Sequence, residues 1–102
     1  MSITADQLFN AYKANEVAAD EKFKDKVLLV SGTIDNIGKD ITDTPYVVLK
    51  AGGDFSFGGV QCMFDDKAKG QLANLQKGQK VQIKGKCNGK MGNVLLRGSV
   101  LQ

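Results

Sequence analysis

The sequence predicts a closed β-barrel of five strands, with one helix before the first strand and a short helix between the third and fourth strands. Two observations favour this fold. The first is the segment 25–35, the longest strand signal in the chain, which is apolar on both faces and has Gly32 near its middle. A strand that is apolar on both faces is covered on both sides, and an internal glycine usually marks a bulge or a bend. Such a strand suits the long, bent first strand of a small barrel.

The second observation is the order of the elements. A helix is expected over 4–22, strands over 25–35, 46–50, 60–64, 79–86 and 93–101, and a short helix over 66–76. Loops are expected over 36–45, 51–59 and 88–92, the last being a hairpin connection with an Asn-Gly signal. A short helix between strands three and four of a five-stranded barrel is the arrangement of the OB-fold. An SH3-like barrel has no comparable helix there, and a ferredoxin-like sandwich would have only four strands.

The start of the N-terminal helix carries a complete capping signal. Thr4 is the expected N-cap, Gln7 closes a capping box, and Ile3 and Leu8 stand at the staple positions. Further along, Asn15 is a polar residue within the apolar stripe of this helix. Its amide either contacts a ligand or bonds to nearby backbone of the barrel, and we favour the second interpretation. The helix is expected to pack on the barrel.

Size and composition indicate one globular domain over residues 1–102, with the N-terminal helix in 1–24 and the barrel in 25–102. Hydrophobic residues make up 42% and charged residues 25%, as is usual for a soluble protein. No apolar run approaches the roughly 18 residues of a membrane span. The first ten residues, MSITADQLFN, have no basic region followed by an apolar one, so they are not a signal peptide. The protein is therefore either cytoplasmic, or periplasmic or envelope-bound after removal of an export signal.

Several segments resemble the tRNA_anti-like family of bacterial OB-fold proteins. These segments are YKANEVAAD (12–20), FKDK (23–26) leading into VSG (30–32), VQCMF (60–64), LQKGQKV (75–81) and KGKC (84–87). The resemblance implies the OB-fold but no agreed activity. Many members of the family look like exported or lipid-anchored envelope proteins, which points to a role as an adaptor in the cell envelope.

The residue types present argue against an enzyme. The chain has no histidine, so it cannot form a Ser-His or Cys-His nucleophile pair, and two cysteines without histidine do not make a usual zinc site. The glycine-rich segments match neither a Walker A loop nor a dinucleotide fingerprint. Asp65 and Asp66 stand at the expected start of a helix, where capping explains them. We therefore expect no catalytic residue, no metal and no cofactor.

The two cysteines, Cys62 and Cys87, both point inward by strand alternation. They are either two buried thiols, a disulfide between the third and fourth strands, or a redox pair. The resemblance to envelope proteins makes the disulfide plausible. The sequence leaves these alternatives open.

Charge is distributed unevenly along the chain. Residues 1–66 carry eleven acids against six lysines, whereas residues 67–102 carry seven lysines and Arg97 without an acid. Such asymmetry can mark a surface for a polyanion, or folding can interleave the two halves so that the field largely cancels. Lys80, Lys84 and Lys86 form a stripe on the fourth strand, which a solvated face also explains.

Two function classes remain, both of them binding functions. OB-folds bind single-stranded nucleic acid over strands two and three, between the loop after strand one and the loop between strands four and five. The candidate groove residues are Tyr46, Phe55 and Phe57 for stacking on bases and Lys50, Lys86, Lys90 and Arg97 for phosphate. Because Asp35, Asp40 and Asp43 follow strand one and would repel phosphate, we favour a protein partner, with nucleic acid as the alternative. A continuous basic groove would favour nucleic acid, and a mixed one an adaptor.

Overall fold

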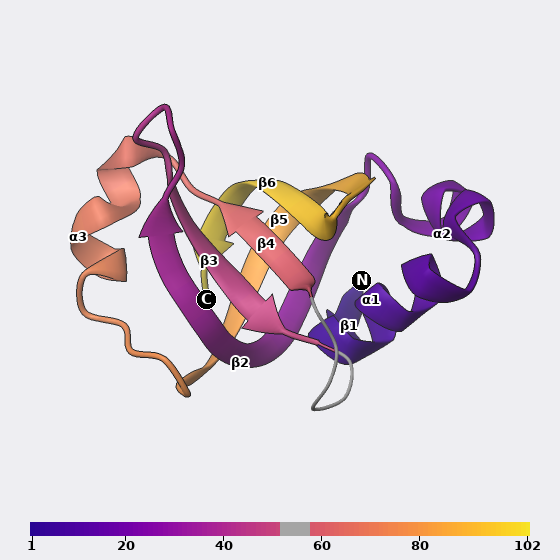
Figure 1. The fold of residues 1–102 in the computed structure, drawn as a ribbon, viewed down its shortest axis with the longest axis horizontal. Coiled ribbons are helices and arrows are strands. Elements are labelled where there is room, and N and C mark those ends of the chain that lie inside the picture. The colour runs from indigo at the N-terminus through magenta and orange to yellow at the C-terminus, as the bar shows by residue number, and fades with distance from the viewer. Residues whose placement is uncertain (52–57) are drawn as a thin grey trace.

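Five strands close the barrel, and a sixth lies outside it. The computed structural model describes residues 1–51 and 58–102, to which the structural statements below refer. The strands are β1 (Ser2–Thr4), β2 (Val27–Lys39), β3 (Pro45–Lys50), β4 (Gly59–Met63), β5 (Lys80–Met91) and β6 (Asn93–Leu101). The ring runs from β2 through β3, β4, β6 and β5 back to β2, and only the β4–β6 pairing within it is parallel. This topology confirms the predicted OB-fold (Figure 1).

The bent strand β2 serves both halves of the barrel, as expected. Its first half pairs with β5 and its second half with β3, and the β2–β3 register shifts between Ile34 and Asn36. Gly32 lies where the strand crosses from one half to the other, and a β-carbon there would approach Ala5 Cβ to 3.1 Å. The absence of a side chain at Gly32 therefore leaves space for the start of the first helix. The bulge itself lies a few residues further along, between Ile34 and Asn36. Because β2 continues to Lys39, the predicted loop 36–45 is wrong and shrinks to a turn over 40–44.

Strand β1 was not predicted. Its three residues run parallel to β2, with Ser2 opposite Leu29 and Thr4 opposite Ser31. A segment of three residues carries too little alternation to be recognised as a strand in the sequence.

The expected continuous helix over 4–22 is wrong, because two helices meet at Asn15. They are α1 (Ala5–Ala14) and α2 (Glu16–Phe23). Asn15 is extended, with φ −161°, and its side-chain oxygen accepts a hydrogen bond from the Ala18 backbone N–H at 3.0 Å. The amide does bond to nearby backbone, but to its own helix rather than to the barrel. The capping box of Thr4 and Gln7 is confirmed, with both hydrogen bonds 3.1 Å long.

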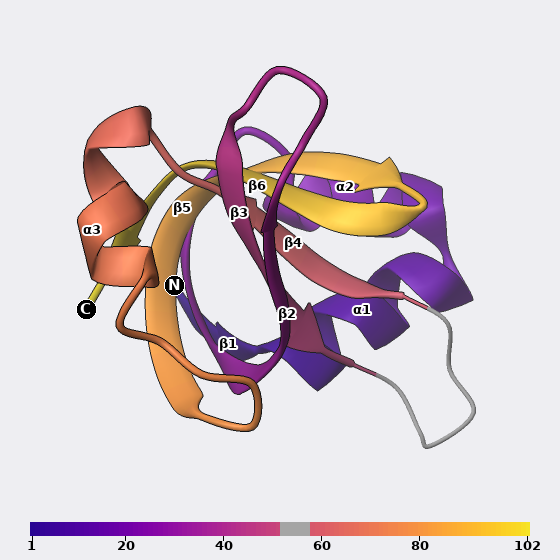
Figure 2. The same ribbon diagram turned by 60° about the vertical axis from the view of Figure 1, so that its left-hand side comes forward.

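Helices cover the two ends of the barrel. At one end α1 buries Leu8, Phe9 and Tyr12, and at the other a 3-10 turn, η1 (Asp66–Ala68), leads into α3 (Lys69–Leu72) (Figure 1; Figure 2). The predicted helix over 66–76 is therefore shorter than expected and ends at Leu72. Of the two acids expected at the start of this helix, Asp65 is the cap, since its carboxylate accepts the Lys67 backbone N–H at 3.0 Å.

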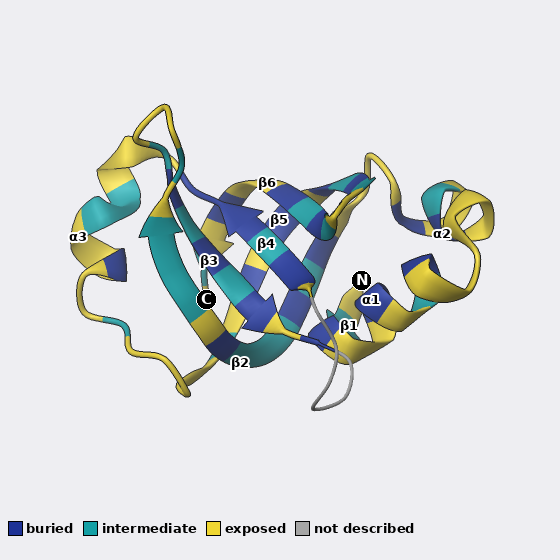
Figure 3. Ribbon diagram, in the orientation of Figure 1, coloured by how far each residue is buried: buried dark blue, intermediate teal, exposed yellow. Residues whose placement is uncertain are grey.

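The core fills the barrel interior and continues under α1 (Figure 3). The inward side chains are almost fully buried, and they are Leu28, Val30 and Ile34 from β2, Val47 and Leu49 from β3, Val60 and Cys62 from β4, Ile83 and Cys87 from β5, and Val94 and Leu96 from β6. Because neighbouring residues on each strand point outward, the outer face of the barrel is free to carry function.

The end of the β5–β6 hairpin differs from the prediction. Strand β5 runs to Met91 instead of ending at Lys86, and the chain reverses at Gly92. The Asn88–Gly89 pair is a bulge inside β5, with Gly89 at φ +90°, rather than the hairpin connection. An Asn-Gly pair favours positive φ in both settings, so the sequence alone does not separate them.

Candidate functional site

The outer face of β3 carries an aromatic ring that lies along the sheet. Tyr46 is half-buried and pairs across the strands with Gly38 of β2. A β-carbon at Gly38 would lie 2.9 Å from the Tyr46 hydroxyl oxygen and 3.1 Å from its Cζ. The glycine thus makes room for the hydroxyl end of the ring, which lies close to the sheet on its outer side. A ring in this position can receive a planar group.

The parallel pairing of β4 and β6 brings an arginine to the same face. The last paired residues of these strands are Cys62 and Leu96, which both point into the core. One position further along stand Met63 and Arg97, which therefore lie next to each other on the outer face. Arg97 is exposed, whereas Met63 is almost fully buried and forms part of the floor.

Together these pairings define one line of side chains across four adjacent strands. Tyr46 stands opposite Met63, and Arg97 stands opposite Lys86. Extending the β4–β6 register by one residue beyond Cys62 and Leu96 places Met63 beside Arg97. We call this line the cross-strand row. Neighbouring strands lie about 4.8 Å apart, so the row is about 14 Å long. It begins with an aromatic ring and ends with two cations.

Two uncharged residues, Gln61 of β4 and Asn93 of β6, lie beside the cross-strand row, and their side-chain amides form hydrogen bonds within the protein. Gln61 donates to the Met63 sulfur at 3.3 Å and accepts from the Asn93 side chain at 3.1 Å. Asn93 in turn accepts the Gly59 backbone N–H at 2.9 Å. This chain of hydrogen bonds holds the floor beside the cross-strand row in one arrangement.

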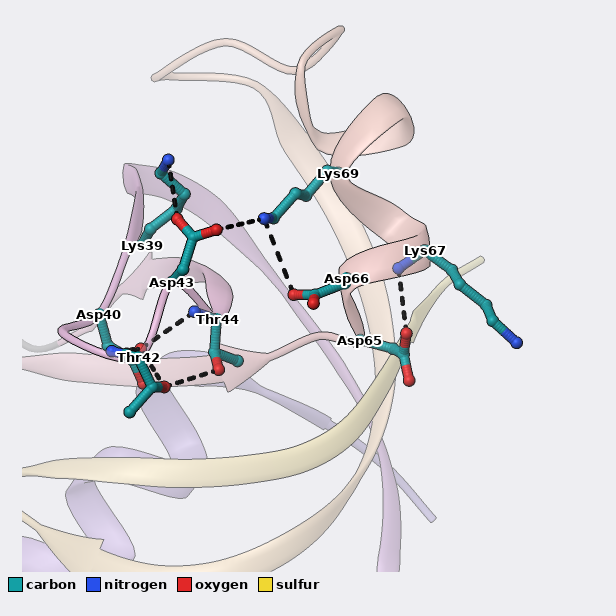
Figure 4. A network of polar contacts seen from close by, with 9 residues as sticks. All are labelled: Lys39, Asp40, Thr42, Asp43, Thr44, Asp65, Asp66, Lys67 and Lys69. Carbon is teal, nitrogen blue, oxygen red and sulfur yellow. Dashed lines mark hydrogen bonds and ion pairs between the residues drawn. The ribbon is translucent and has the colours of Figure 1, made fainter.

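The turn over 40–44 frames one side of this face and is fixed by Asp40. One carboxylate oxygen of Asp40 accepts hydrogen bonds from the Thr42 hydroxyl at 2.6 Å, the Thr42 N–H at 2.8 Å and the Thr44 N–H at 3.0 Å (Figure 4). These bonds, the one from the Thr42 hydroxyl above all, lower the pKa of Asp40. The carboxylate is thus used to shape the turn.

The other acid of the turn, Asp43, is paired with two lysines. Its oxygens lie 2.7 Å from Lys69 Nζ of α3 and 2.9 Å from Lys39 Nζ of β2 (Figure 4). The Lys69 and Lys39 hydrogen bonds lower the pKa of Asp43 to about 2. The negative charge that argued against phosphate binding is therefore offset at this position by two neighbouring cations.

With the barrel and its outer face described, the chain can be compared with known proteins. The profile of the tRNA_anti-like family matches residues 1–100. The chain belongs to the tRNA_anti-like family. This confirms the resemblance seen in the sequence.

A solved structure shares the fold of this tRNA_anti-like protein. It is described as a putative nucleic acid-binding lipoprotein from Klebsiella pneumoniae subsp. pneumoniae MGH 78578. The two chains superimpose with a TM-score of 0.77 at 17% sequence identity, over 99% of this chain and 92% of the other. At this identity the likeness supports the fold alone. A search among curated proteins gave no significant match.

The structure brings together three of the seven predicted groove residues, Tyr46, Lys86 and Arg97. Lys50 lies at the far end of β3 and lines a separate groove of about 690 Å³, and Lys90 lies near the tip of the β5–β6 hairpin. Phe55 and Phe57 lie outside the described residues. Met63 was missed, although its outward direction was clear from alternation. The position of Met63 beside Arg97 could not be inferred, because only the β4–β6 register brings the two residues together.

Both cysteines are free, buried thiols in the structure. Burial raises the pKa of the Cys62 thiol to about 12. Cys87 Sγ lies 3.5 Å from the Tyr12 hydroxyl, and burial followed by this contact raises the pKa of Tyr12. A thiol that stays protonated and covered is a packing group rather than a nucleophile.

The described residues hold neither a cluster of metal-binding side chains nor a helix that could span a membrane. They contain no group of three or more acidic, cysteine or histidine side chains placed to hold a metal ion. Within the same residues, none of the helices has the length and apolar character needed to cross a membrane.

Proposed function

We propose that this tRNA_anti-like protein binds single-stranded nucleic acid along the cross-strand row of Tyr46, Met63, Arg97 and Lys86. The main support for the proposal is the sequence of side chains along the row, in which an aromatic ring is followed by two cations. A ring on the outer side of the sheet can stack on a base regardless of the base's identity, and cations along the same row can neutralise phosphates. The row crosses the strands of the face over which OB-folds bind oligonucleotides.

The charges around the row support this proposal. Within the part of the chain that the structure describes, neither Lys86 nor Arg97 forms an ion pair, whereas Asp43 is engaged by two lysines. The cations are thus available to a ligand and the acid is not. The description of the Klebsiella structure agrees with the same class of ligand.

Fluorescence anisotropy with a labelled single-stranded oligonucleotide at two salt concentrations tests the proposal. Tyr46→Ala should weaken binding by about tenfold, since one stacked base contributes about 1–3 kcal/mol. The double variant Lys86→Gln, Arg97→Gln should weaken binding. It should also reduce the slope of log affinity against log salt concentration by about 0.7 for each phosphate contact that is lost. Lys13→Gln, an exposed change on α1, is the control and should leave affinity unchanged. The proposal would be rejected if no oligonucleotide bound at low salt, or if Tyr46→Ala bound with the same affinity as the wild type.

A protein partner is the second candidate, and one observation favours it. Ile41 is fully exposed at the tip of the turn fixed by Asp40, and Met91 is largely exposed at the tip of the β5–β6 hairpin. Exposed apolar side chains on ordered turns suit a protein contact. An adaptor role would be supported by two results together: the protein binds no oligonucleotide, and a protein partner binds the wild type but not Ile41→Ser.

A further inference from the structure

A hollow of about 390 Å³ lies on the outer face of the barrel, next to the basic end of the cross-strand row. It lies where β5 runs between β2 and β6. Its lining residues are Val27, Lys84, Gly85, Lys86, Arg97, Gly98, Val100 and Gln102. It shares Lys86 and Arg97 with the row and extends away from Tyr46.

A bulge in β6 lines this hollow. Lys86 stands opposite Arg97, but Lys84 stands opposite Val100, so that β6 has one more residue than β5 over this interval. Gly98 takes up the extra residue at φ +61°, in the left-handed region that favours glycine. As a result Ser99 turns inward beside Gly85 and is buried, and Val100 turns outward again. The bulge thus places Arg97 and Val100 on the same face.

The lining combines cations with exposed apolar surface. Lys84, Lys86 and Arg97 supply three positive charges, and none of them forms an ion pair within the described residues. No acid lies on β5 or β6, because residues 67–102 contain none. Val27 and Val100 are 51% and 55% exposed, although both are apolar. Cations around an apolar surface suit a group that is anionic on one side and apolar on the other.

We propose that this hollow is a second subsite for the nucleic-acid strand, beyond the cross-strand row. Lys84, together with Lys86 and Arg97, contacts a phosphodiester group there, and Val27 and Val100 contact the adjoining sugar or base. The strand therefore continues round the barrel from the row onto β5 and the start of β2. This inference rests on the proposed function, and it adds that the bound length exceeds what the row alone can hold.

The test compares two lysines on one strand, with two lengths of oligonucleotide. Lys84→Gln removes a charge from the hollow, and Lys80→Gln removes the same charge four residues earlier on the outward face of β5, outside the hollow. Affinity is measured for oligonucleotides of about 4 and about 12 nucleotides, within the range of site sizes of OB-folds. Lys84→Gln should weaken binding of the longer strand about twofold to fivefold more than Lys80→Gln does. The two variants should bind the short strand equally.

Val100→Ser provides a readout without a charge change. It should weaken binding of the longer strand while leaving the salt dependence unaltered, whereas Lys84→Gln should reduce the salt slope by about 0.7. Circular dichroism of each variant checks that the barrel is retained. If the longer strand binds in a Tyr46-dependent manner but Lys84→Gln equals Lys80→Gln, the subsite is rejected while the proposed function stands. If no oligonucleotide binds, both are rejected.

Discussion

The ring of Tyr46 lies over Gly38, the residue opposite it on β2, and a β-carbon at Gly38 would come within 2.9 Å of the tyrosine hydroxyl oxygen. A glycine at this position of a strand is otherwise unfavourable, because it packs nothing and costs backbone entropy. The position of the Tyr46 ring therefore depends on the absence of a β-carbon at Gly38.

Gly38→Ala should therefore move the Tyr46 ring without unfolding the barrel. The nearest atoms belong to the far end of a side chain, which can tilt away, so the free energy of unfolding should change by less than about 0.5 kcal/mol. Oligonucleotide affinity should fall toward that of Tyr46→Ala. Urea denaturation and anisotropy on the same samples separate the two effects.

Gly70→Ala is the matched control for this change. Gly70 is an exposed glycine of α3, and a β-carbon there meets nothing within 4 Å. Alanine should keep affinity and stabilise the helix by up to about 1 kcal/mol. If Gly38→Ala also kept full affinity, the ring would not be a stacking platform.

The pairing of Asp43 with Lys39 and Lys69 predicts a pH dependence of stability. The pKa of Asp43 is lowered to about 2 in the folded protein, below its value in the unfolded chain. At intermediate pH the unfolded state therefore binds more protons, and the stabilisation is full above pH 5 and lost as pH falls toward 2. Wild type should be slightly more stable than Asp43→Asn at pH 5, and most of this difference should be lost by about pH 2.

Urea unfolding from pH 5 to pH 2 measures this difference. The matched background carries Lys39→Gln and Lys69→Gln, in which Asp43→Asn should produce no pH-dependent difference. Because the pair is exposed, the effect should also shrink in high salt. A difference between wild type and Asp43→Asn that stays constant across this pH range would contradict the ion-pair assignment.

The barrel could be predicted because its strands carry a local signal. Strand β6 was expected over 93–101 and is found there, since its inward residues Val94 and Leu96 alternate with outward Leu95 and Arg97. The order of elements then selected the OB-fold. Errors arose at the ends of elements and at breaks within them, where one side chain decides between two arrangements. Asn15 divides a helical stripe by capping α2, which apolar periodicity does not reveal.

The candidate site was only partly predictable, because it depends on register between distant segments. Tyr46 was proposed from its residue type, and Lys86 and Arg97 from their charge. Their alignment with Met63 follows from the parallel β4–β6 pairing, which joins segments more than 30 residues apart. The ion pair of Asp43 could not be predicted for the same reason, since its partner Lys69 lies on α3, 26 residues further along the chain.

Both thiols should be unreactive in the native protein. Cys62 and Cys87 are fully buried, and with a pKa of about 12 the Cys62 thiol contains almost no thiolate at neutral pH. A chromogenic thiol reagent should detect no thiol in the native protein and both thiols after denaturation without reductant. A denatured, unreduced sample without thiols would instead support the Cys62–Cys87 disulfide.

The break between α1 and α2 predicts the sign of a single substitution. In the structure Asn15 caps α2, so Asn15→Ala should destabilise the protein by about 1 kcal/mol. Asn15→Asp retains a capping oxygen and should stay close to wild type. In a continuous helix the exposed Asn15 would be an interior position, and alanine would stabilise it by up to about 0.7 kcal/mol. Chemical denaturation of the three proteins therefore separates the two arrangements, because stabilisation by Asn15→Ala would require one uninterrupted helix.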